Sequence, residues 1–397
     1  MPFFFLICPN AIRTNWVCML NDEFLDQCRL LGDPPADEAL AALIAEKGEA
    51  EARRLFDLLI RRIEMPIEEL PASLRGFLAS TDRLPDWADP HKVDLAHELF
   101  LDHGPKFLVF LYYKSLPLLY SCANGAQVLV RTSRLTNDTQ DLTIFTRRIA
   151  ETGQFLLEVM SRGNLQPGRP GIQAIQKVRL IHASIRRFLP KADWDPAWGT
   201  PINQEDMAVT LMTFSISMID ALGQFDIPER EERLETFLHT WTAIGQLLGI
   251  REELLPRTLP EARNLIDRIL ARQSKASEAG TLLTNALLDF AESVLPDRFD
   301  ALPKHLMQHL IGPERAQMLG VSPANGCLAF LLPEALRTYF RISERLEDRI
   351  EQPLGVFLDL LARKTAEGMV GYFDKHKGRA FHIPAALEAS FLPPSDT

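Results

Sequence analysis

The sequence has no long hydrophobic run, which argues against a membrane-spanning protein. No uninterrupted stretch approaches the roughly 18 apolar residues that a transmembrane helix needs. Residues 3–7 are apolar, but no positive charge precedes them and Pro9 follows closely. They therefore lack the charged region and the longer apolar core of a signal peptide. We expect a cytoplasmic protein without a transmembrane segment.

Cysteine is also scarce. The five cysteines are Cys8, Cys18, Cys28, Cys122 and Cys327, and none belongs to a Cys-x-x-Cys pair. An odd number without paired spacing indicates neither a disulfide framework nor a thiolate metal site. We expect reduced thiols with a structural role.

Positive charge is in the minority, because 43 Lys and Arg residues face 53 Asp and Glu residues and the formal net charge is -10. Nucleic-acid binders concentrate Lys and Arg to neutralise phosphates, so nucleic acid is not an expected partner. Three enzyme signatures are missing as well: the Walker-type glycine loop, the Gly-x-Ser-x-Gly elbow and the Gly-x-Gly-x-x-Gly dinucleotide turn. Clusters of arginine in this acidic chain therefore need a local explanation.

What the chain does contain is hydrophobic residues at helical spacing. They make up 46% of the sequence, which is enough for a substantial core. Besides a helix around residues 178–187, we expect helices at 37–63 with a break at Gly48, 93–116 with an interruption near Gly104-Pro105, 141–161, 203–222 with Asn203 as N-cap, 228–249, 259–272, 276–294, 304–310, 333–350 and 353–366. No regular alternation with strands occurs, so the pattern predicts an all-α fold, a single large helical bundle.

We divide the chain into an N-terminal helical cap at residues 1–75, a main helical domain at 76–392 and a disordered tail at 393–397. A polar, proline-bearing stretch at 71–90 separates the cap from the main body, with Trp87 as an anchor. A loop at 163–171 precedes the helix around His182. Residues 126–130 are too few to distinguish strand from coil.

The most informative segment is Val-Arg-Leu-Ile-His-Ala-Ser-Ile-Arg-Arg at residues 178–187. Arg179 precedes His182 by three residues and Arg186 follows it by four, so the three side chains share one face of a helix. This combination suits a haem, whose iron needs a nitrogen donor and whose propionates need cations. The plainer alternative is a core or surface histidine that happens to lie beside arginines.

Three sequence blocks together resemble the catalytic domain of the rubber oxygenase (latex-clearing protein) family, which also includes the membrane-bound oxygenase of fungal mycophenolic acid synthesis. The blocks are Arg-Ile-Ala-Glu-Thr at 148–152, His182 with Arg186, and Trp-Gly-Thr-Pro-Ile-Asn-Gln-Glu-Asp at 198–206. The resemblance runs from about Leu84 to about Gly320. It implies a globin-like helical core that holds haem b, with His182 as the proximal iron ligand and Arg148 and Thr152 as essential pocket residues.

The same resemblance implies dioxygen and an apolar, unsaturated substrate, because the family attacks isoprenoid double bonds and yields carbonyl products. Two arrangements of the pocket stay open. In one, Arg148 and Thr152 lie on the distal side, where they hydrogen-bond bound dioxygen. In the other, which we favour for Arg148, its guanidinium binds a propionate and the Thr152 hydroxyl bonds to the carbonyl four residues back.

Two positions depart from the family pattern. Latex-clearing members carry, directly before the threonine, a lysine that can occupy the sixth iron position, and Glu151 stands there in this chain. An ungapped count places Thr132 where those enzymes have a glutamate thought to act as base. Both departures weaken rubber cleavage as the activity and leave the haem hypothesis standing.

Other residues offer weaker candidates. Phe107, Phe110, Tyr112 and Tyr113 could line an apolar channel, although aromatic residues at this spacing are usually core. His305 and His309 are four residues apart but lack the intervening glutamate of a zinc protease motif. His239 is a reserve candidate for a second histidine beside the haem.

Three hypotheses follow. The first is a haem b dependent, dioxygenase-like oxidoreductase that acts with dioxygen on a small apolar alkene or isoprenoid-like molecule. Its iron ligand is His182, and Arg148, Thr152, Arg179 and Arg186 contact the cofactor. The second is a non-catalytic haem or apolar-ligand binding protein of the same fold, and the third is a helical scaffold without cofactor. The sequence identifies neither the substrate, the sixth iron ligand, an electron donor nor the oligomeric state.

Overall fold

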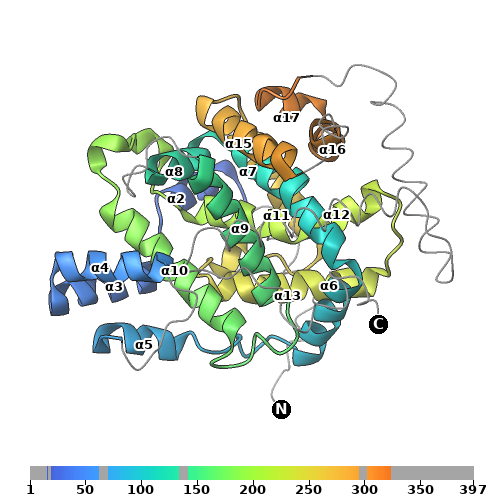
Figure 1. Ribbon diagram of the computed structural model, residues 1–397. Coiled ribbons are helices and arrows are strands. Elements are labelled where there is room, and N and C mark those ends of the chain that lie inside the picture. Colours follow the sequence, from blue (N-terminus) through green and yellow to red (C-terminus); the bar gives the residue numbers. More distant parts are fainter. Residues whose placement is uncertain (1–15, 17–18, 62–69, 134–141, 295–301, 323–397) are drawn as a thin grey trace, which may run out of the picture.

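The structure is a computed structural model that describes residue 16 and residues 19–61, 70–133, 142–294 and 302–322. Within these ranges every regular element is a helix, and the one β-type contact is an isolated bridge between Cys122 and Ser274 (Figure 1). The all-α prediction is confirmed. The helices expected at 333–350 and 353–366, the tail at 393–397, and Cys8, Cys18 and Cys327 lie outside the described residues.

The helices expected within the described residues are present, and helices that were not expected from the sequence occur with them at 22–29, 72–80, 123–133 and 313–318. In chain order the longer elements are α2 (Asp22–Arg29), α3 (Pro34–Lys47), α4 (Glu49–Arg61), α5 (Ala72–Ser80), α6 (Pro90–Phe110), the π-helix η2 (Leu111–Ser115), α7 (Leu116–Ser121), α8 (Ala123–Ser133), α9 (Leu142–Val159), α10 (Pro170–Phe188), α11 (Gln204–Phe214), α12 (Ile216–Gln224), α13 (Glu231–Leu247), α14 (Leu259–Gln273), α15 (Glu278–Val294), α16 (Leu302–Ile311) and α17 (Pro313–Met318). Short 3-10 turns lie at Lys191–Asp193, Pro196–Trp198 and Glu252–Leu254.

Local signals set several of these ends. Gly48 has a φ of 83° and separates α3 from α4, as predicted. Asn203 caps α11, because its Oδ1 accepts a hydrogen bond from the backbone N–H of Asp206 at 2.9 Å. Side-chain oxygens that bond orphan N–H groups stabilise a helix start by about 1 kcal/mol.

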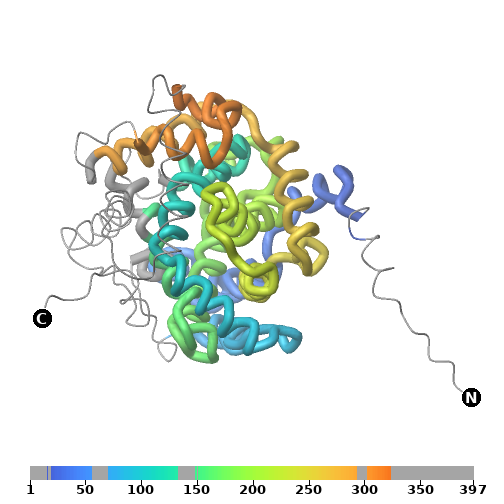
Figure 2. Tube along the Cα trace, turned by 90° about the vertical axis from the view of Figure 1, so that its right-hand side faces the viewer, coloured from blue at the N-terminus to red at the C-terminus, as the bar shows by residue number. Residues whose placement is uncertain are grey.

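The helices surround one large apolar core. α6 packs along α13, and α11 lies in the middle, against α2, α7, α13 and α14. α15 to α17 lie at the top and α5 at the bottom in both orthogonal views (Figures 1 and 2). A second, smaller cluster joins buried residues of α3 and α5 to Leu180, Ala183 and Phe188 of α10. α2, by contrast, contributes Leu25 and Cys28 to the main core.

One helical stretch among the described residues is long and apolar enough to cross a membrane by composition. It is Gln204–Gln224, which comprises α11 and α12, and 78% of its apolar window is buried inside the protein. Burial of this kind is what the central helix of a bundle requires. The stretch therefore gives no clear transmembrane segment.

Three local features differ from what the sequence alone indicated. The stretch at 71–90 contains α5, and residues 126–130 belong to α8, because a short apolar run takes its structure from the elements packed around it. Pro105 lies inside α6 without breaking it, since the helix is held on its apolar side by α13 and the rest of the core. The irregularity comes instead at η2, where a π-turn follows α6.

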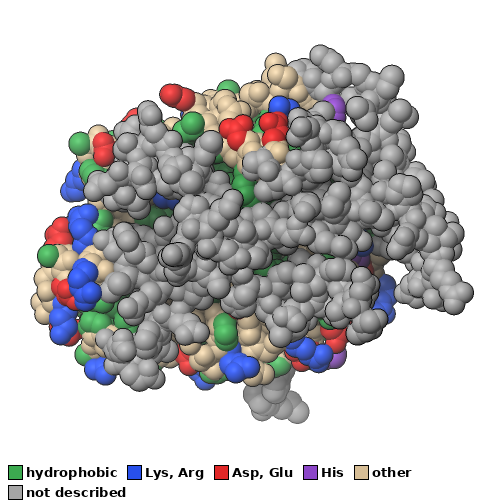
Figure 3. Space-filling model, in the orientation of Figure 1, with side chains coloured by type: hydrophobic (Ala, Val, Ile, Leu, Met, Phe, Trp, Pro, Cys, Tyr) green, Lys and Arg blue, Asp and Glu red, His purple; other side chains and the backbone are tan. Residues whose placement is uncertain are grey.

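The N-terminal helices are fastened to α10 by ion pairs. Arg179 donates two hydrogen bonds to the carboxylate of Asp33, one of them from Nη2 to Oδ1 at 2.8 Å, and both side chains are buried. Arg186 Nε donates to Asp37 Oδ1 at 2.8 Å. By comparison, Figure 3 shows Lys or Arg and Asp or Glu side chains interspersed at the exposed edge near α3 and α4. There Glu49 pairs with Arg187, and both side chains are about half exposed.

The buried pair predicts a large stability effect. Asp33→Asn keeps a side-chain oxygen for the cap of α3 but leaves the Arg179 cation without its counter-charge in the interior. We expect the free energy of unfolding to fall by about 3–5 kcal/mol, measured by urea titration. Glu49→Gln, which breaks the exposed pair, is the matched control and should cost less than about 1 kcal/mol. Equal effects of the two changes would contradict this ranking.

Candidate functional site

His182 lies on α10, the helix that packs against α9, α3 and α4. Pro170 occupies the first turn, where its missing N–H costs nothing. The residue is partly buried, and its Nδ1 atom is buried with no hydrogen-bond partner among the described residues. Burial, with a smaller contribution from Arg186, lowers the pKa of His182 to about 3. The side chain is therefore a neutral imidazole at physiological pH, with an uncommitted ring nitrogen.

Arg179, one turn before His182, is hydrogen-bonded to the N-terminal helices. Besides its bonds to Asp33, Nη1 donates to the backbone carbonyl of Leu247 at 3.2 Å, and the guanidinium lies 5.2 Å from the centroid of the Phe77 ring. Gly249 makes room for this pair, because a Cβ atom there would lie 2.6 Å from Asp33 Oδ2 and 2.8 Å from Arg179 Nε. A propionate contact for Arg179 stays a prediction and would require the pair with Asp33 to open.

Arg186, one turn after His182, has one N–H group without a hydrogen-bond partner among the described residues. Its Nε binds Asp37 and its Nη1 donates to the Ile202 carbonyl at 3.3 Å, whereas Nη2 is buried with no hydrogen-bond partner in the described part of the chain. Gly32 lies against this pair, since a Cβ atom there would come within 2.9 Å of Arg186 Cδ and of Asp37 Oδ2. Of the two flanking arginines, Arg186 is the one that fits a further carboxylate.

Arg148 and Thr152 lie on α9, and the Thr152 contact is the one expected in the second arrangement considered above, whereas a propionate contact for Arg148 stays a prediction. The Thr152 hydroxyl donates to the backbone carbonyl of Arg148 at 2.7 Å, the bond to the carbonyl four residues back. The Arg148 guanidinium reaches α8: Nη1 donates to the Leu129 carbonyl at 2.6 Å and Nη2 to Thr132 Oγ1 at 2.7 Å. Thr132 in turn donates to the Val128 carbonyl at 2.6 Å.

Thr132 is thus a direct hydrogen-bond partner of one of the predicted site residues. It is buried and lies in direct contact with Arg148. A hydroxyl at this position can accept a hydrogen bond from the guanidinium, but a neutral hydroxyl is far too weak a base to take up a proton as a carboxylate does. Glu151, on the same helix, is partly buried.

The aromatic residues proposed for a channel behave mainly as core. Phe107 stacks on Phe237 with ring centroids 5.2 Å apart, and Phe110 stacks on Phe225 at 5.7 Å. Phe107, Phe110, Tyr112 and Tyr113 are all at most 1% exposed. The two phenylalanines therefore pack against other aromatic side chains of the core.

The remaining histidines have other roles. His239 Nε2 accepts a hydrogen bond from the Asp89 backbone N–H at 2.9 Å, and its ring lies edge-on to Trp87. Trp87 anchors its loop, as expected, by donating from Nε1 to Gln246 Oε1 at 2.7 Å. No group of three or more His, Cys, Asp and Glu side chains suited to a metal ion occurs in the described ranges, the pair His305 and His309 included.

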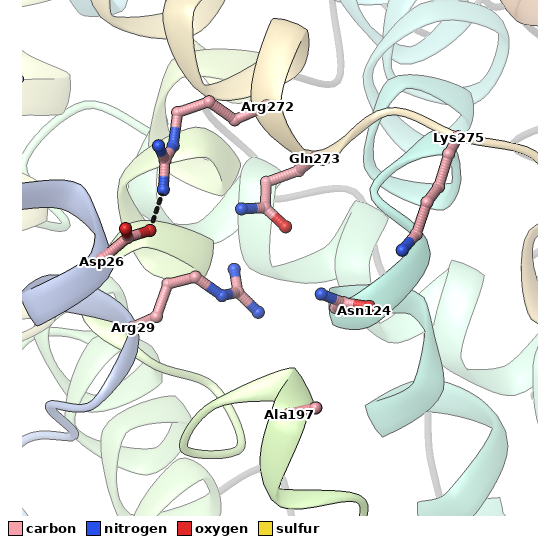
Figure 4. Close-up of a pocket in the computed structure, with 7 residues that line it drawn as sticks. All are labelled: Asp26, Arg29, Asn124, Ala197, Arg272, Gln273 and Lys275. Carbon is pink, nitrogen blue, oxygen red and sulfur yellow. Dashed lines mark hydrogen bonds and ion pairs between the residues drawn. The ribbon is translucent and has the colours of Figure 1, made fainter. Parts of the chain in front are cut away.

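A polar cleft of about 340 Å³ opens elsewhere on the molecule (Figure 4). Its lining residues come from α2, α8, the turn at Pro196–Trp198 and the end of α14, and they are Asp26, Arg29, Asn124, Ala197, Arg272, Gln273 and Lys275. None of the predicted site residues lines it. Arg272 is paired with Asp26 across its wall, as the dashed line in Figure 4 shows.

A buried charge network lies beside this cleft. Glu205 is fully buried and accepts from Arg29 Nη1 at 3.0 Å, Arg272 Nε at 3.0 Å and Gln273 Nε2 at 2.9 Å. Arg29 also binds Asp206 at 3.1 Å. The charges of the cleft wall are therefore largely compensated within the protein, and we assign the cleft no ligand.

Comparisons with known proteins identify the family and the fold of the chain. The family model described as "ER-bound oxygenase mpaB/B'/Rubber oxygenase, catalytic domain" matches residues 109–363. A protein named rubber oxygenase from Streptomyces sp. (strain K30) is 26% identical over 304 residues, which cover 73% of this chain and 70% of that protein. The solved structure of latex clearing protein LCP in the closed state superposes with a TM-score of 0.70 at 24% identity, covering 85% of this chain and 90% of that one.

The helical fold and the family model together indicate an oxygenase catalytic domain. Because the family model spans well over half of the chain, the chain belongs to the mpaB/rubber oxygenase catalytic-domain family. The matched range includes Arg148, Thr152 and His182.

Two features of the site escaped the sequence interpretation. Asp33 and Asp37, which bind Arg179 and Arg186, flank the Pro34-Pro35 start of α3 and resemble ordinary N-terminal helix acids. The contact between Arg148 and Thr132 joins residues on two helices. The sequence offered one hint. Arg179 and Arg186 lie one helical turn before and after His182, and two arginines near the core of an acidic chain need carboxylate partners.

The contact between Arg148 and Thr132 predicts an energetic coupling. A double-mutant cycle with Arg148→Met and Thr132→Val, followed by urea unfolding, should give an interaction energy of about 1 kcal/mol. The reason is that each change leaves the other polar group without its partner. A second cycle, Thr132→Val with Thr152→Val, is the control and should be additive within about 0.5 kcal/mol. Additivity in the first cycle would contradict the contact.

Asp206 predicts a pH effect. Burial, aided by Glu205, raises the pKa of Asp206 to about 6 against the lowering effect of Arg29 and Asn203. The folded protein then keeps a proton that the unfolded chain releases near pH 4, so this residue's contribution to stability falls as the pH rises from about 4 to about 6, by ~1.4 kcal/mol per pKa unit. Asp206→Asn should therefore gain stability relative to the original protein over this window. A difference that is constant between pH 4 and pH 7 would disprove the assignment.

Proposed function

We propose that this protein is a haem b dependent oxygenase that uses dioxygen on an apolar, alkene-containing molecule. The observation that carries the proposal is the state of His182: a neutral imidazole with a buried, uncommitted ring nitrogen, on a helix whose flanking arginines are already neutralised. Neutral imidazole is a standard ligand for haem iron. Family membership supports the same reaction class.

The substrate class rests on the relatives. The Streptomyces relative is named rubber oxygenase, and rubber is a polyisoprenoid hydrocarbon. Cleavage of a carbon–carbon double bond by one molecule of dioxygen gives two carbonyl groups, and the four electrons that dioxygen accepts come from the substrate. The reaction balances without an external electron donor. The haem iron would supply the activation of dioxygen.

The side chains of this protein would divide the remaining tasks. His182 would hold the iron. Arg186, through its unpaired Nη2, would bind a propionate, while Arg179 and Asp33 would position α10. Arg148 and Thr152 are the proposed pocket residues on α9, and the bond between Arg148 and Thr132 fixes the guanidinium against α8.

A second candidate function is a non-catalytic haem or apolar-ligand binding protein of the same fold. Thr132 favours it, because a hydroxyl bonded to Arg148 and to the Val128 carbonyl cannot serve as a general base. The two functions differ in whether oxygenated products form, and both differ from a cofactor-free helical scaffold in the absorption spectrum.

The decisive change is His182→Ala. The purified protein, supplied with haem during expression, should show a Soret band, and this variant should lose the band and at least tenfold in haem content while staying folded by circular dichroism. His239→Ala is the matched control, because the His239 ring already accepts a hydrogen bond from the Asp89 backbone N–H. This control variant should retain haem. A Soret band that survives His182→Ala would exclude this residue as the ligand.

Activity is tested with the haem-loaded protein. Incubation with dioxygen and a panel of isoprenoid alkenes should yield aldehydes or ketones, detected by mass spectrometry after carbonyl derivatisation. Haem without any carbonyl product across the panel would favour the binding protein. A colourless protein after haem supplementation would exclude both candidates and favour the scaffold.

A further inference from the structure

A π-turn interrupts the longest helical run of the described chain. Residues 90–121 are helical throughout, and within them Leu111–Ser115 form η2 between α6 and α7. A π-turn adds a residue to the helix and rotates the side chains that follow, and such turns are frequent at functional sites. This one lies in the core and contacts α6, α7, α11, α12 and α16.

The second residue of η2 carries a buried polar atom that the protein leaves unused. Tyr112 is 1% exposed, and its hydroxyl has no hydrogen-bond partner among the described residues. Its ring lies 6.2 Å from that of Phe290 on α15 and 6.3 Å from that of Tyr113. Burying a hydroxyl without a partner destabilises the folded state, and native proteins rarely keep one without a reason.

Other polar groups lie near Tyr112. Tyr120, on α7, is close enough to Tyr112 to raise the pKa of that phenol, and Arg148 is close enough to Tyr120 to act electrostatically on it. α15 packs against α7, α8 and α9, and the hydroxyl of its fully buried Thr284 is likewise without a partner in the described structure. Two buried hydroxyls without a partner among the described residues, those of Tyr112 and Thr284, therefore lie on elements that both contact α7.

The Tyr112 hydroxyl is available as a neutral hydrogen-bond donor or acceptor, and not as a phenolate anion. Burial, with Tyr113 and Tyr120 nearby, raises the pKa of Tyr112 well above its ordinary value. The phenol therefore stays protonated at physiological pH. A protonated phenol in an apolar surrounding is a strong and selective partner for a carbonyl or ether oxygen.

We propose that the Tyr112 hydroxyl binds an oxygen atom of the ligand, and that this protein acts on an isoprenoid-like chain that already carries a carbonyl or ether oxygen. The inference rests on the proposed function and narrows its substrate. A pocket for a plain hydrocarbon needs no donor, whereas a site built around a buried donor discriminates strongly against ligands that lack the acceptor.

The test uses Tyr112→Phe in the haem-loaded protein and two probes. One is geranylacetone, an isoprenoid methyl ketone, and the other is the hydrocarbon in which a methylene group replaces its carbonyl. Without probe, Tyr112→Phe should melt about 1–2 °C higher than the original protein, because an unsatisfied hydroxyl is gone. The affinity for geranylacetone should fall about tenfold, and that for the hydrocarbon should not change.

Ser115→Ala is the matched control in the same π-turn. The Ser115 hydroxyl is also fully buried, but it donates to the backbone carbonyl of Thr213. This variant should melt lower than the original protein and keep its preference for the ketone. It therefore separates the loss of a structural hydrogen bond from the loss of one reserved for a ligand.

Each other outcome overturns the inference. A lower melting temperature for Tyr112→Phe would show that the hydroxyl has a structural partner. A higher melting temperature with an unchanged preference for the ketone would show that the hydroxyl serves no ligand, and so would equal affinities of the original protein for the two probes. These results leave the haem spectrum and the oxygenation assay unaffected, so the proposed function can stand or fall separately.

Discussion

The pairing of α10 with α3 is the constraint on which the rest of the site depends. Arg179 and Arg186 lie one turn before and one turn after His182, and each is bound by an aspartate of α3 or its cap, Asp33 and Asp37. The two aspartates are four positions apart and the two arginines seven, so forming both pairs fixes how the two helices meet. The pair of Arg179 with Asp33 is buried, whereas Asp37 is partly exposed. Breaking a buried pair leaves an uncompensated charge in the interior, which disfavours other registers of the two helices.

The same pairing explains the chemistry available to His182. Two uncompensated guanidinium groups beside a buried ring would leave two charges without partners in the interior. With each arginine neutralised, the imidazole lies in a locally balanced environment, and its low pKa keeps it neutral. Gly32 and Gly249 leave room for the paired side chains, because a Cβ atom at either position would collide with them.

The fold was largely predictable from the sequence, and the site was predictable in part. Hydrophobic periodicity located most helices, and Gly48 and Asn203 marked ends that the structure confirms. Pro105 suggested an interruption that does not occur, because packing of α6 along α13 outweighs the destabilising effect of a proline inside a helix. The π-turn at η2 has no local signature. Asp33, Asp37 and Thr132 were missed as partners because each contact joins distant or separate helices, which no spacing along the chain records.

Iron at His182 is the claim on which both the haem assignment and the substrate inference rest. The most direct measurement is an anomalous diffraction map collected at the iron absorption edge from crystals of the haem-loaded protein. The account predicts one strong iron peak within coordination distance of a ring nitrogen of His182, about 2 Å. An iron peak bound by any other residue, with the His182 ring turned away from it, would contradict the account.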